Sequence, residues 1–301
     1  MYIGIDLGGS HIGMACVTPE GKIQKKFEKD LTSEDKSNIK QVITETIINV
    51  LQKWVNEDQI TIEKIGIGVP GIVQNNQIVH AVNLGIKNLD LKTKLQEVFP
   101  KVDIKIQNDA KCAALAEKRL GALKKFKDCI FICLGTGIGG AAFYNNELIV
   151  PKRSSGFEFG HMIIQKNGNL CRCGSKGCFE TYGSIKKFKN DVKSKLDLPE
   201  FVDGKDLVDI VEYNLNTDAI QDIINEYVDN LCVGISNIIN ILEPEAICLG
   251  GGFVHYKDFL LNKLKNKLYG EGYIFFKDEF PYITTAELGN DAGIIGSAMY
   301  I

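Results

Sequence analysis

The sequence predicts an α/β protein that consists of two similar domains. Its 301 residues correspond to about two domains of roughly 150 residues each. A pattern of strand, glycine loop, strand, turn and strand occurs twice, at residues 2–27 and again at 130–150. Such a repeat favours a duplicated fold whose halves each present a backbone-rich loop to a shared cleft.

In the first half, strands and helices alternate, and a polar residue, Asp109, follows the carboxyl end of a predicted strand. The elements expected there are strands at 2–5, 12–17, 22–27, 64–69 and 102–106 and helices at 38–55 and 110–120. We expect Ser37 to cap the first of these helices. Asp109 follows the last strand and precedes the second helix, and α/β proteins place their chemistry at such carboxyl ends.

The second half repeats the strand pattern and adds longer helices. Its expected elements are strands at 130–134, 141–144, 147–150 and 246–249 and helices at 219–242 and 256–268. The tail at 288–298 contains small residues at a spacing that lets a helix pack closely against its neighbour.

Composition excludes several classes of function. The net charge is -3 and charged residues make up 24% of the chain without a dense basic block, so we expect no nucleic-acid partner. The longest uncharged stretch, 129–146, is interrupted by glycine and asparagine, which argues against a membrane span. An odd number of cysteines, nine, and an N-terminus unlike a signal peptide predict a cytoplasmic protein.

Three glycine clusters, at 8–9, 135–140 and 250–252, each follow a predicted strand. Glycine lets backbone N–H groups approach a phosphate closely, so we interpret the clusters as phosphate-binding loops. Asp6 beside the first loop is placed to hold Mg²⁺, usually through water. The alternatives are tight turns for the loops and a turn residue for Asp6.

The second cluster also satisfies a dinucleotide-binding pattern. Gly135, Gly137 and Gly140 follow a strand, and Glu158 lies further along the chain. That motif requires a helix to begin at the third glycine, whereas 141–150 has the pattern of a hairpin around Asn145-Asn146. We therefore interpret the match as accidental.

A cluster of metal-binding residues lies between 161 and 180. His161, Cys171, Cys173 and Cys178 form a Cys₃His set, typical of a closed structural Zn²⁺ site. The alternative is a group of reactive or disulfide-forming thiols. Glu158 and Glu180 flank this set, and a metal there would hold both carboxylates in place, which makes a polyol-binding pocket plausible.

Together these motifs resemble the ROK family, named for repressors, open reading frames and kinases, within the sugar-kinase, actin and heat-shock ATPase superfamily. The resemblance covers essentially the whole chain. The matching motifs are Asp6-Leu7-Gly8-Gly9-Ser10, Gly68-Val69-Pro70-Gly71, Asn108-Asp109, residues 134–140, Glu158-Phe159-Gly160-His161, residues 171–180 and Gly250-Gly251-Gly252.

The resemblance implies two RNase H-like lobes, of the actin and hexokinase type, around a central cleft. Residues 1–118 with 287–301 would form a small N-terminal lobe, and 119–286 a large C-terminal lobe with a zinc loop at 161–180. It also implies ATP with Mg²⁺, a structural Zn²⁺ and phosphorylation of a hexose. Glucose is the favoured substrate, and N-acetylmannosamine, N-acetylglucosamine, allose and fructose remain alternatives. A homodimer is expected from the habit of the family.

The resemblance assigns a role to individual residues. Asp109 would be the catalytic base. The hexose would be bound by Gly71, Asn83, Asn108, Asp109, Glu158, His161 and Glu180, the nucleotide by Asp6, Gly8, Gly9, Ser10, Thr136, Gly137, Gly251 and Gly252, and zinc by His161, Cys171, Cys173 and Cys178.

This sequence departs from the family pattern at two sites. Ser10-His11 stands where members more often have Thr followed by Lys or Asn, and the serine hydroxyl preserves phosphate binding. Ile86 stands where many have Trp, at a position that bears on sugar preference. We also expect no winged-helix DNA-binding region, because the first loop begins at residue 6. The rival functions are a sugar-sensing protein without turnover and an actin-like assembly or chaperone ATPase.

Overall fold

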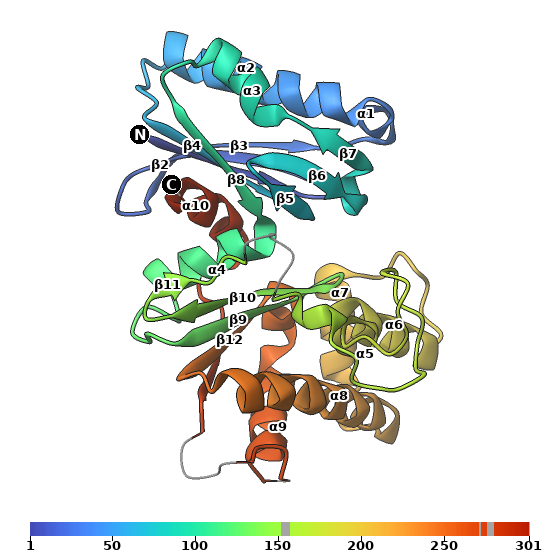
Figure 1. Ribbon diagram of the computed structural model, residues 1–301. Helices are drawn as coiled ribbons and strands as arrows, with labels where there is room; N and C mark the ends of the chain where they lie inside the picture. Colours follow the sequence, from blue (N-terminus) through green and yellow to red (C-terminus); the bar gives the residue numbers. More distant parts are fainter. Residues whose placement is uncertain (152–156, 271, 276–279, 301) are drawn as a thin grey trace. The chain divides into compact units, whose positions relative to one another are not determined.

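The computed structural model describes residues 1–151, 157–270, 272–275 and 280–300 (Figure 1). The chain divides into two compact units. The first comprises Met1–Lys124 and Glu287–Ile301 with a short segment that starts at Val150, and the second comprises Lys125–Ile149 and Phe157–Ala286.

A five-stranded sheet forms the centre of the first unit. Its strands lie in the order β3-β2-β1-β4-β8. Their bounds are β1 Tyr2–Leu7, β2 His11–Val17, β3 Ile23–Asp30, β4 Lys64–Val69 and β8 Asp103–Asn108. Strand β1 pairs antiparallel with β2 and parallel with β4, so the hairpin and the parallel strands meet at β1.

The second unit repeats this sheet. Its order is β11-β10-β9-β12-β13, with bounds β9 Cys129–Leu134, β10 Ile138–Tyr144, β11 Glu147–Leu148, β12 Ala246–Gly250 and β13 Tyr282–Thr285. Strand β9 pairs antiparallel with β10 and parallel with β12, as β1 does with its neighbours. The predicted α/β class and the predicted duplication are therefore confirmed.

Helices cover one face of the first sheet with an apolar stripe. In helix α2 (Ile39–Asn56) the side chains of Ile43, Ile47 and Leu51 are fully buried at helical spacing, and α3 (Leu91–Val98) lies on the same face (Figure 1). The expected Ser37 cap is wrong. Ser37 ends the separate helix α1 (Ser33–Ser37), where its hydroxyl donates to the carbonyl of Glu34, and Asn38 precedes α2.

Helix α10 (Ala292–Met299) packs against the opposite face of this sheet. A Cβ added to Gly4 would lie 2.0 Å from the carbonyl oxygen of Ile294, and one added to Gly66 would lie 1.7 Å from that of Ser297. Only glycine permits this approach. The close packing predicted for the tail is confirmed.

A second, three-stranded sheet in the first unit is absent from the sequence prediction. It consists of β5 (Ile72–Gln74), β6 (Gln77–Ala81) and β7 (Ile86–Leu89), and the short helix η1 (Val82–Leu84) joins the last two strands. Its strands are too short to give a clear alternating pattern.

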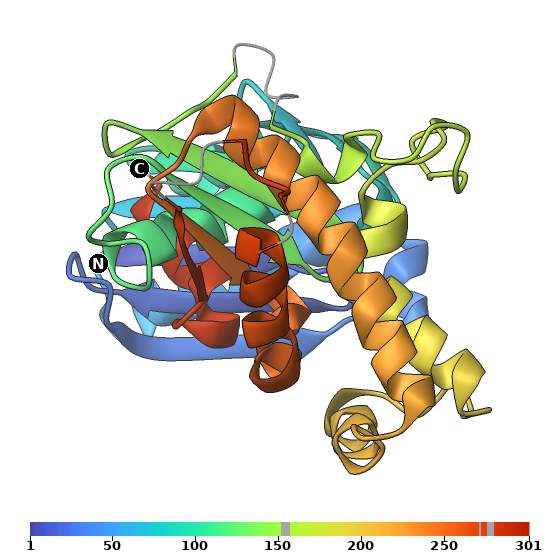
Figure 2. The same ribbon diagram turned by 90° about the horizontal axis from the view of Figure 1, so that it is seen from below.

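Two long helices pack on the sheet of the second unit. Helix α8 (Asp218–Leu242) contributes Ile224, Leu231 and Ile235 to a core shared with the strands, and α9 (Lys257–Gly270) packs beside it (Figures 1 and 2). The remaining helices of this unit are α5 Glu180–Gly183, α6 Ile185–Lys195 and α7 Gly204–Tyr213. Within the described part of the chain, no helix is both long and apolar enough to cross a membrane.

Candidate functional site

The carboxylate of Asp6 is largely buried in the first unit, with 18% of the side chain exposed. It is near the end of β1, and a Cβ added to Gly293 would lie 2.8 Å from its Oδ2 atom. Burial, and to a lesser degree the negative charge of Asp109, raises the pKa of Asp6 to about 7. A bound cation would reverse this shift by favouring the ionised form, so the residue suits a Mg²⁺ site.

His11 lies beside Asp6, a placement that the sequence pattern did not predict. Its Nε2 atom lies 3.9 Å from Asp6 Oδ2, and a Cβ on Gly8 would lie 2.4 Å from the imidazole ring. Gly8 therefore has to lack a side chain so that the ring can lie over the glycine loop. The position of a histidine two residues beyond a glycine pair is the signal that could have indicated it.

Asn108 and Asp109 occupy the junction of β8 and helix α4 (Asp109–Arg119). Asn108 caps the helix, because its Oδ1 accepts from the N–H of Lys111 at 3.3 Å. Its Nδ2 donates to the carbonyl of Gly71 at 3.3 Å, and Asp109 Oδ1 accepts from the N–H of Ala110 at 2.8 Å. The structure thus brings three predicted sugar ligands, Gly71, Asn108 and Asp109, together.

Asn83 and Ile86 differ in solvent exposure. Asn83 is exposed on η1. A Cβ added to Gly9 would lie 3.4 Å from the Cβ of Asn83, so Asn83 lies beside the first glycine loop. Ser10, in that loop, is exposed. Ile86 is fully buried in the hydrophobic core, which makes it a packing residue in this structure.

The second glycine loop is a tight turn between β9 and β10. The N–H of Gly135 donates to the carbonyl of Gly137 at 2.9 Å, and the carbonyl of Gly135 accepts from the N–H of Lys186 at 3.1 Å. Thr136 at the tip is exposed. Gly140 lies inside strand β10, so no helix begins at the third glycine and the dinucleotide interpretation is excluded.

Glu180, predicted as a sugar ligand, is bound directly to this loop. Its Oε2 accepts from the N–H of Ile138 at 3.0 Å, and its Oε1 lies 3.4 Å from Nη2 of Arg172. A Cβ added to Gly137 would lie 2.2 Å from Oε2. The sequence predicts that Glu180 and Gly137 bind different substrates, and it contains no signal that the two residues touch.

The third glycine loop borders a cavity of about 390 Å³. Gly251 has φ +69°, and the helix η3 (Gly251–Tyr256) follows directly. The cavity is lined by Gly252, His255 and Tyr256 of η3 and by Lys189, Lys205 and Val208 of α6 and α7. The hydroxyl of Tyr256 is buried and has no hydrogen-bond partner among the described residues.

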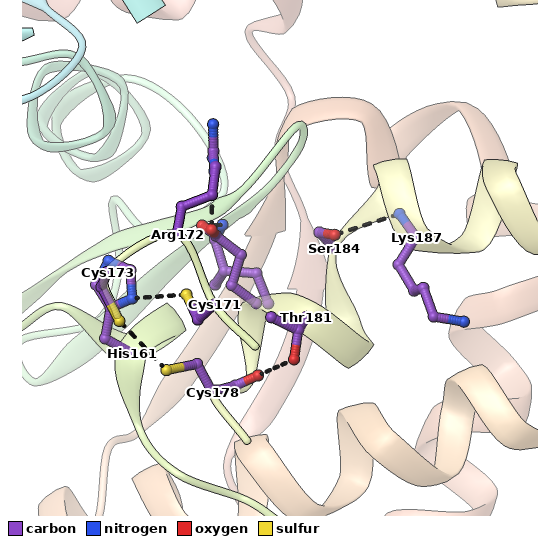
Figure 3. A network of polar contacts seen from close by, with 10 residues as sticks. His161, Cys171, Arg172, Cys173, Cys178, Thr181, Ser184 and Lys187 are labelled. Atoms are coloured by element: carbon purple, nitrogen blue, oxygen red, sulfur yellow. Dashed lines mark hydrogen bonds and ion pairs between the residues drawn. The ribbon is translucent and has the colours of Figure 1, made fainter. Parts of the chain in front are cut away.

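The Cys₃His set converges in space. Figure 3 shows His161 and the three cysteines turned toward one another, and their ligand atoms all lie within 4.8 Å. His161 Nδ1 lies 3.7 Å from the sulfur of Cys171, and the sulfurs of Cys173 and Cys178 are 3.6 Å apart. Tetrahedral zinc with bonds of about 2.0–2.3 Å spaces its ligands by roughly 3.5–3.8 Å, so the set fits that metal.

Two thiols of this set, Cys173 and Cys178, have shifted pKa values of opposite direction. A hydrogen bond from the backbone of Ser175 is the main cause that lowers the pKa of Cys173 to about 6, while burial raises the pKa of Cys178 to about 12. Two glycines with positive φ shape the loop: Gly174 (+92°) and Gly177 (+86°). Of the other six cysteines, all but the half-buried Cys133 are buried, as expected for residues that fill an apolar core.

Glu158 and His161 lie at the two ends of the short helix η2 (Phe159–His161), with Glu158 preceding it. Both side chains are exposed. The intervening Gly160 packs on the start of β10, because a Cβ there would lie 2.3 Å from the carbonyl oxygen of Ile138. Ile138 therefore contacts Glu180 through its N–H and Gly160 through its carbonyl.

Comparison with known proteins gives one consistent picture. The model of the ROK family matches residues 2–301. A glucokinase of Halalkalibacterium halodurans is 31% identical over 100% of this chain and 94% of its own length. A xylose repressor of Bacillus spizizenii is 30% identical over 99% of this chain and 76% of its own. The crystal structure of a ROK family glucokinase from Streptomyces griseus, in complex with glucose and AMPPNP, superposes with a TM-score of 0.80 at 25% identity and covers 99% of this chain and 98% of that one.

Proposed function

Since the chain belongs to the ROK family, we propose that it is an ATP-dependent kinase that phosphorylates a hydroxyl group of a hexose, with glucose as the first candidate. The observation that carries this proposal is the junction of β8 and α4, where Asn108, Gly71 and Asp109 are linked at the carboxyl end of a strand. A glucokinase relative and a glucose-bound structural relative support glucose as the substrate.

Asp109 would act as the general base. A sugar hydroxyl is a poor nucleophile near neutral pH, so a carboxylate within hydrogen-bond reach must accept its proton during attack on the γ-phosphorus. The hydrogen bond from the N–H of Ala110 to Asp109 Oδ1 fixes the carboxylate that would accept the proton. Asn108, as the helix cap, holds the preceding backbone in place.

Three loops would bind the nucleotide. Gly8, Gly9 and Ser10 in the first unit and Thr136 and Gly137 in the second offer backbone and hydroxyl donors to the phosphates. Asp6 would hold Mg²⁺, whose charge helps to neutralise the phosphoryl oxygens.

The cavity beside Gly252 suits the nucleoside. Gly252 lines this cavity, and Gly251, with φ +69°, directly precedes Gly252. This arrangement supports the assignment of Gly251 and Gly252 to the nucleotide.

The zinc-binding set would hold His161 in an orientation that suits binding of the sugar. His161 Nδ1 points to Cys171 and would bind the metal, so Nε2 would keep its proton and serve as a hydrogen-bond donor to a sugar hydroxyl. Bound Zn²⁺ would contribute folding free energy rather than Lewis-acid chemistry, because all four positions are taken by protein ligands.

The experiment is a panel of hexoses assayed for release of ADP with MgATP. Faster turnover with glucose than with the other sugars would support the proposal. Faster turnover with N-acetylmannosamine, N-acetylglucosamine, allose or fructose would identify that sugar as the substrate instead of glucose. Binding of a sugar without ADP release would favour the second candidate, a sugar-responsive protein without turnover, which the 30% identity to a xylose repressor supports.

Two further assignments complete the proposal. The odd number of cysteines, nine, suits a reducing compartment such as the cytoplasm. A homodimer is the expected assembly, and sedimentation velocity of the purified chain tests it.

A further inference from the structure

We propose that Glu180 is a positioning residue that couples sugar binding to nucleotide binding, through its hydrogen bond to the N–H of Ile138 in the phosphate loop. This inference rests on the proposed kinase function and adds to Glu180 a task beyond contact with the sugar. The two partners lie 42 positions apart in sequence and are joined by a bond of 3.0 Å.

The bond attaches Glu180 to the part of the loop that would bind phosphate. Ile138 is the first residue of β10, and its neighbour Gly137 is one of the predicted phosphate donors. Because a Cβ on Gly137 would lie 2.2 Å from Glu180 Oε2, the carboxylate rests directly against the loop backbone. Any shift of the carboxylate therefore has to move the loop or break the bond.

The loop is held at one further point. The carbonyl of Gly135 accepts from the N–H of Lys186 in α6, which follows α5 closely in sequence. Glu180 is the first residue of α5. The two anchors of the loop thus come from a single short segment of chain, which lets one movement act on both.

Glu180 also retains the capacity to bind a sugar. A carboxylate offers about four lone-pair sites, and the described contacts use one on Oε2 for Ile138 and one on Oε1 for Arg172. Its side chain is 14% exposed, so a hydroxyl group can reach the remaining sites. Figure 3 shows Arg172 beside the metal-binding set, and its Nη2 atom lies 3.4 Å from Oε1 of Glu180.

Sugar hydroxyls that donate to Glu180 would restrict its rotation. The same restriction would fix the N–H of Ile138 and the turn at 135–137, so the loop would be ordered before the nucleotide arrives. Binding to a loop that is already ordered costs less conformational entropy. The nucleotide should consequently bind more tightly when sugar is present, and by reciprocity sugar should bind more tightly in the presence of nucleotide.

Calorimetry measures this coupling directly. The dissociation constant of AMPPNP with Mg²⁺ is determined with and without saturating glucose, and the ratio of the two values is the coupling factor. We expect at least about 5-fold for the unmodified chain, the lower end of ordinary allosteric coupling. Glu180→Ala should bring the factor close to one.

Two further variants separate coupling from simple loss of sugar affinity. Glu180→Gln keeps an oxygen acceptor for the N–H of Ile138, so it should weaken glucose binding yet retain part of the coupling. Glu158→Ala is the matched control. It removes another predicted sugar ligand, one whose side chain makes no hydrogen bond to the loop within the described residues. It should weaken glucose binding and leave the coupling factor unchanged.

Gly137→Ala provides a second route if Glu180→Ala fails to fold. The added methyl group would displace the carboxylate while Glu180 itself remains, and the coupling factor should fall toward one. A coupling factor of one in the unmodified chain overturns the inference, as does an undiminished factor in both Glu180→Ala and Gly137→Ala. If the unmodified chain binds neither glucose nor AMPPNP, the proposed function itself is wrong and the inference falls with it.

Discussion

The side chain of Glu117 accepts a 2.8 Å hydrogen bond from the backbone N–H of Leu288, 171 positions further along the chain. The same Oε1 atom accepts from the N–H of Glu287 at 2.9 Å, and Oε2 accepts from that of Ala122 at 2.9 Å. The chain passes between the units after Lys124 and after Ala286. The fully buried carboxylate of Glu117, on α4, therefore binds the backbone close to both of these crossing points.

Replacing Glu117 should destabilise the protein strongly. Glu117→Leu has a similar volume but leaves three partly buried N–H groups without their carboxylate acceptor, and a loss of this kind costs about 1–3 kcal/mol for a buried group. We expect a decrease of about 3 kcal/mol or more in the free energy of unfolding, measured by urea denaturation. Glu117→Gln should lose less, because it keeps one oxygen acceptor. The control Glu97→Leu, on an exposed position of α3, should change stability little. A loss for Glu117→Leu no larger than for this control would contradict the prediction.

Asp109→Asn should separate chemistry from binding. The amide oxygen can still accept from the N–H of Ala110, so the fold and sugar affinity should remain close to those of the unmodified chain. The side chain can no longer accept the proton of the sugar hydroxyl, and kcat should fall by about 10²- to 10⁴-fold. Steady-state kinetics and glucose titration measure the two effects. Asp103→Asn, exposed at the other end of β8, is the control. Near-normal turnover of Asp109→Asn would show that Asp109 is not the general base.

Stability of the ligand-free protein should depend on pH through Asp6. Its pKa is raised from 3.8 to about 7. Between these values the folded protein holds a proton that the unfolded chain has released, so the free energy of unfolding falls as the pH rises from about 4 to about 7. A shift of one pKa unit corresponds to about 1.4 kcal/mol, which gives a total of up to roughly 4 kcal/mol.

Asp6→Asn cannot ionise and should lack this decline. We expect the variant to be more stable than the unmodified chain at about pH 8 in EDTA, with little difference near pH 4, and to lose turnover with MgATP. Urea denaturation of both proteins across this pH range is the measurement. Parallel stability profiles would show that Asp6 has an ordinary pKa in the folded protein.

Loss of zinc should weaken sugar binding before it weakens nucleotide binding. Cys173→Ala removes one ligand of the set, so the metal can no longer fix His161 or the loop that leads to Glu180. We expect one Zn²⁺ per chain in the unmodified protein, a lower melting temperature in the variant and glucose affinity reduced by about 10-fold or more. Cys16→Ala, in the core of the first unit, should keep both zinc and glucose affinity. Absence of zinc from the unmodified protein, or unchanged glucose and ADP affinities in Cys173→Ala, would refute the coupling.

The sequence predicts those parts of the fold whose signal is local. Glycine loops after apolar runs, the hairpin at Asn145-Asn146 and the spacing of the three cysteines all lie within short segments, and strand β4 has the predicted bounds. Contacts between distant segments have no such signal. Nothing in the sequence around Gly137 indicates that Glu180 rests against it, nor does the pattern of α4 reveal that Glu117 binds the backbone at 287–288. The buried position of Ile86 depends likewise on the unpredicted sheet of β5, β6 and β7.

The close packing of α10 on Gly4 and Gly66 also constrains the order in which the chain can fold during synthesis. The ribosome makes α10 after the whole of the second unit, so the surface around these two glycines stays uncovered until then. Strands β9, β10, β12 and β13 can therefore assemble while β1 and β4 still expose apolar surface that awaits its last helix. The nascent first unit would then offer a binding site for a chaperone until residues 292–299 have left the ribosomal tunnel.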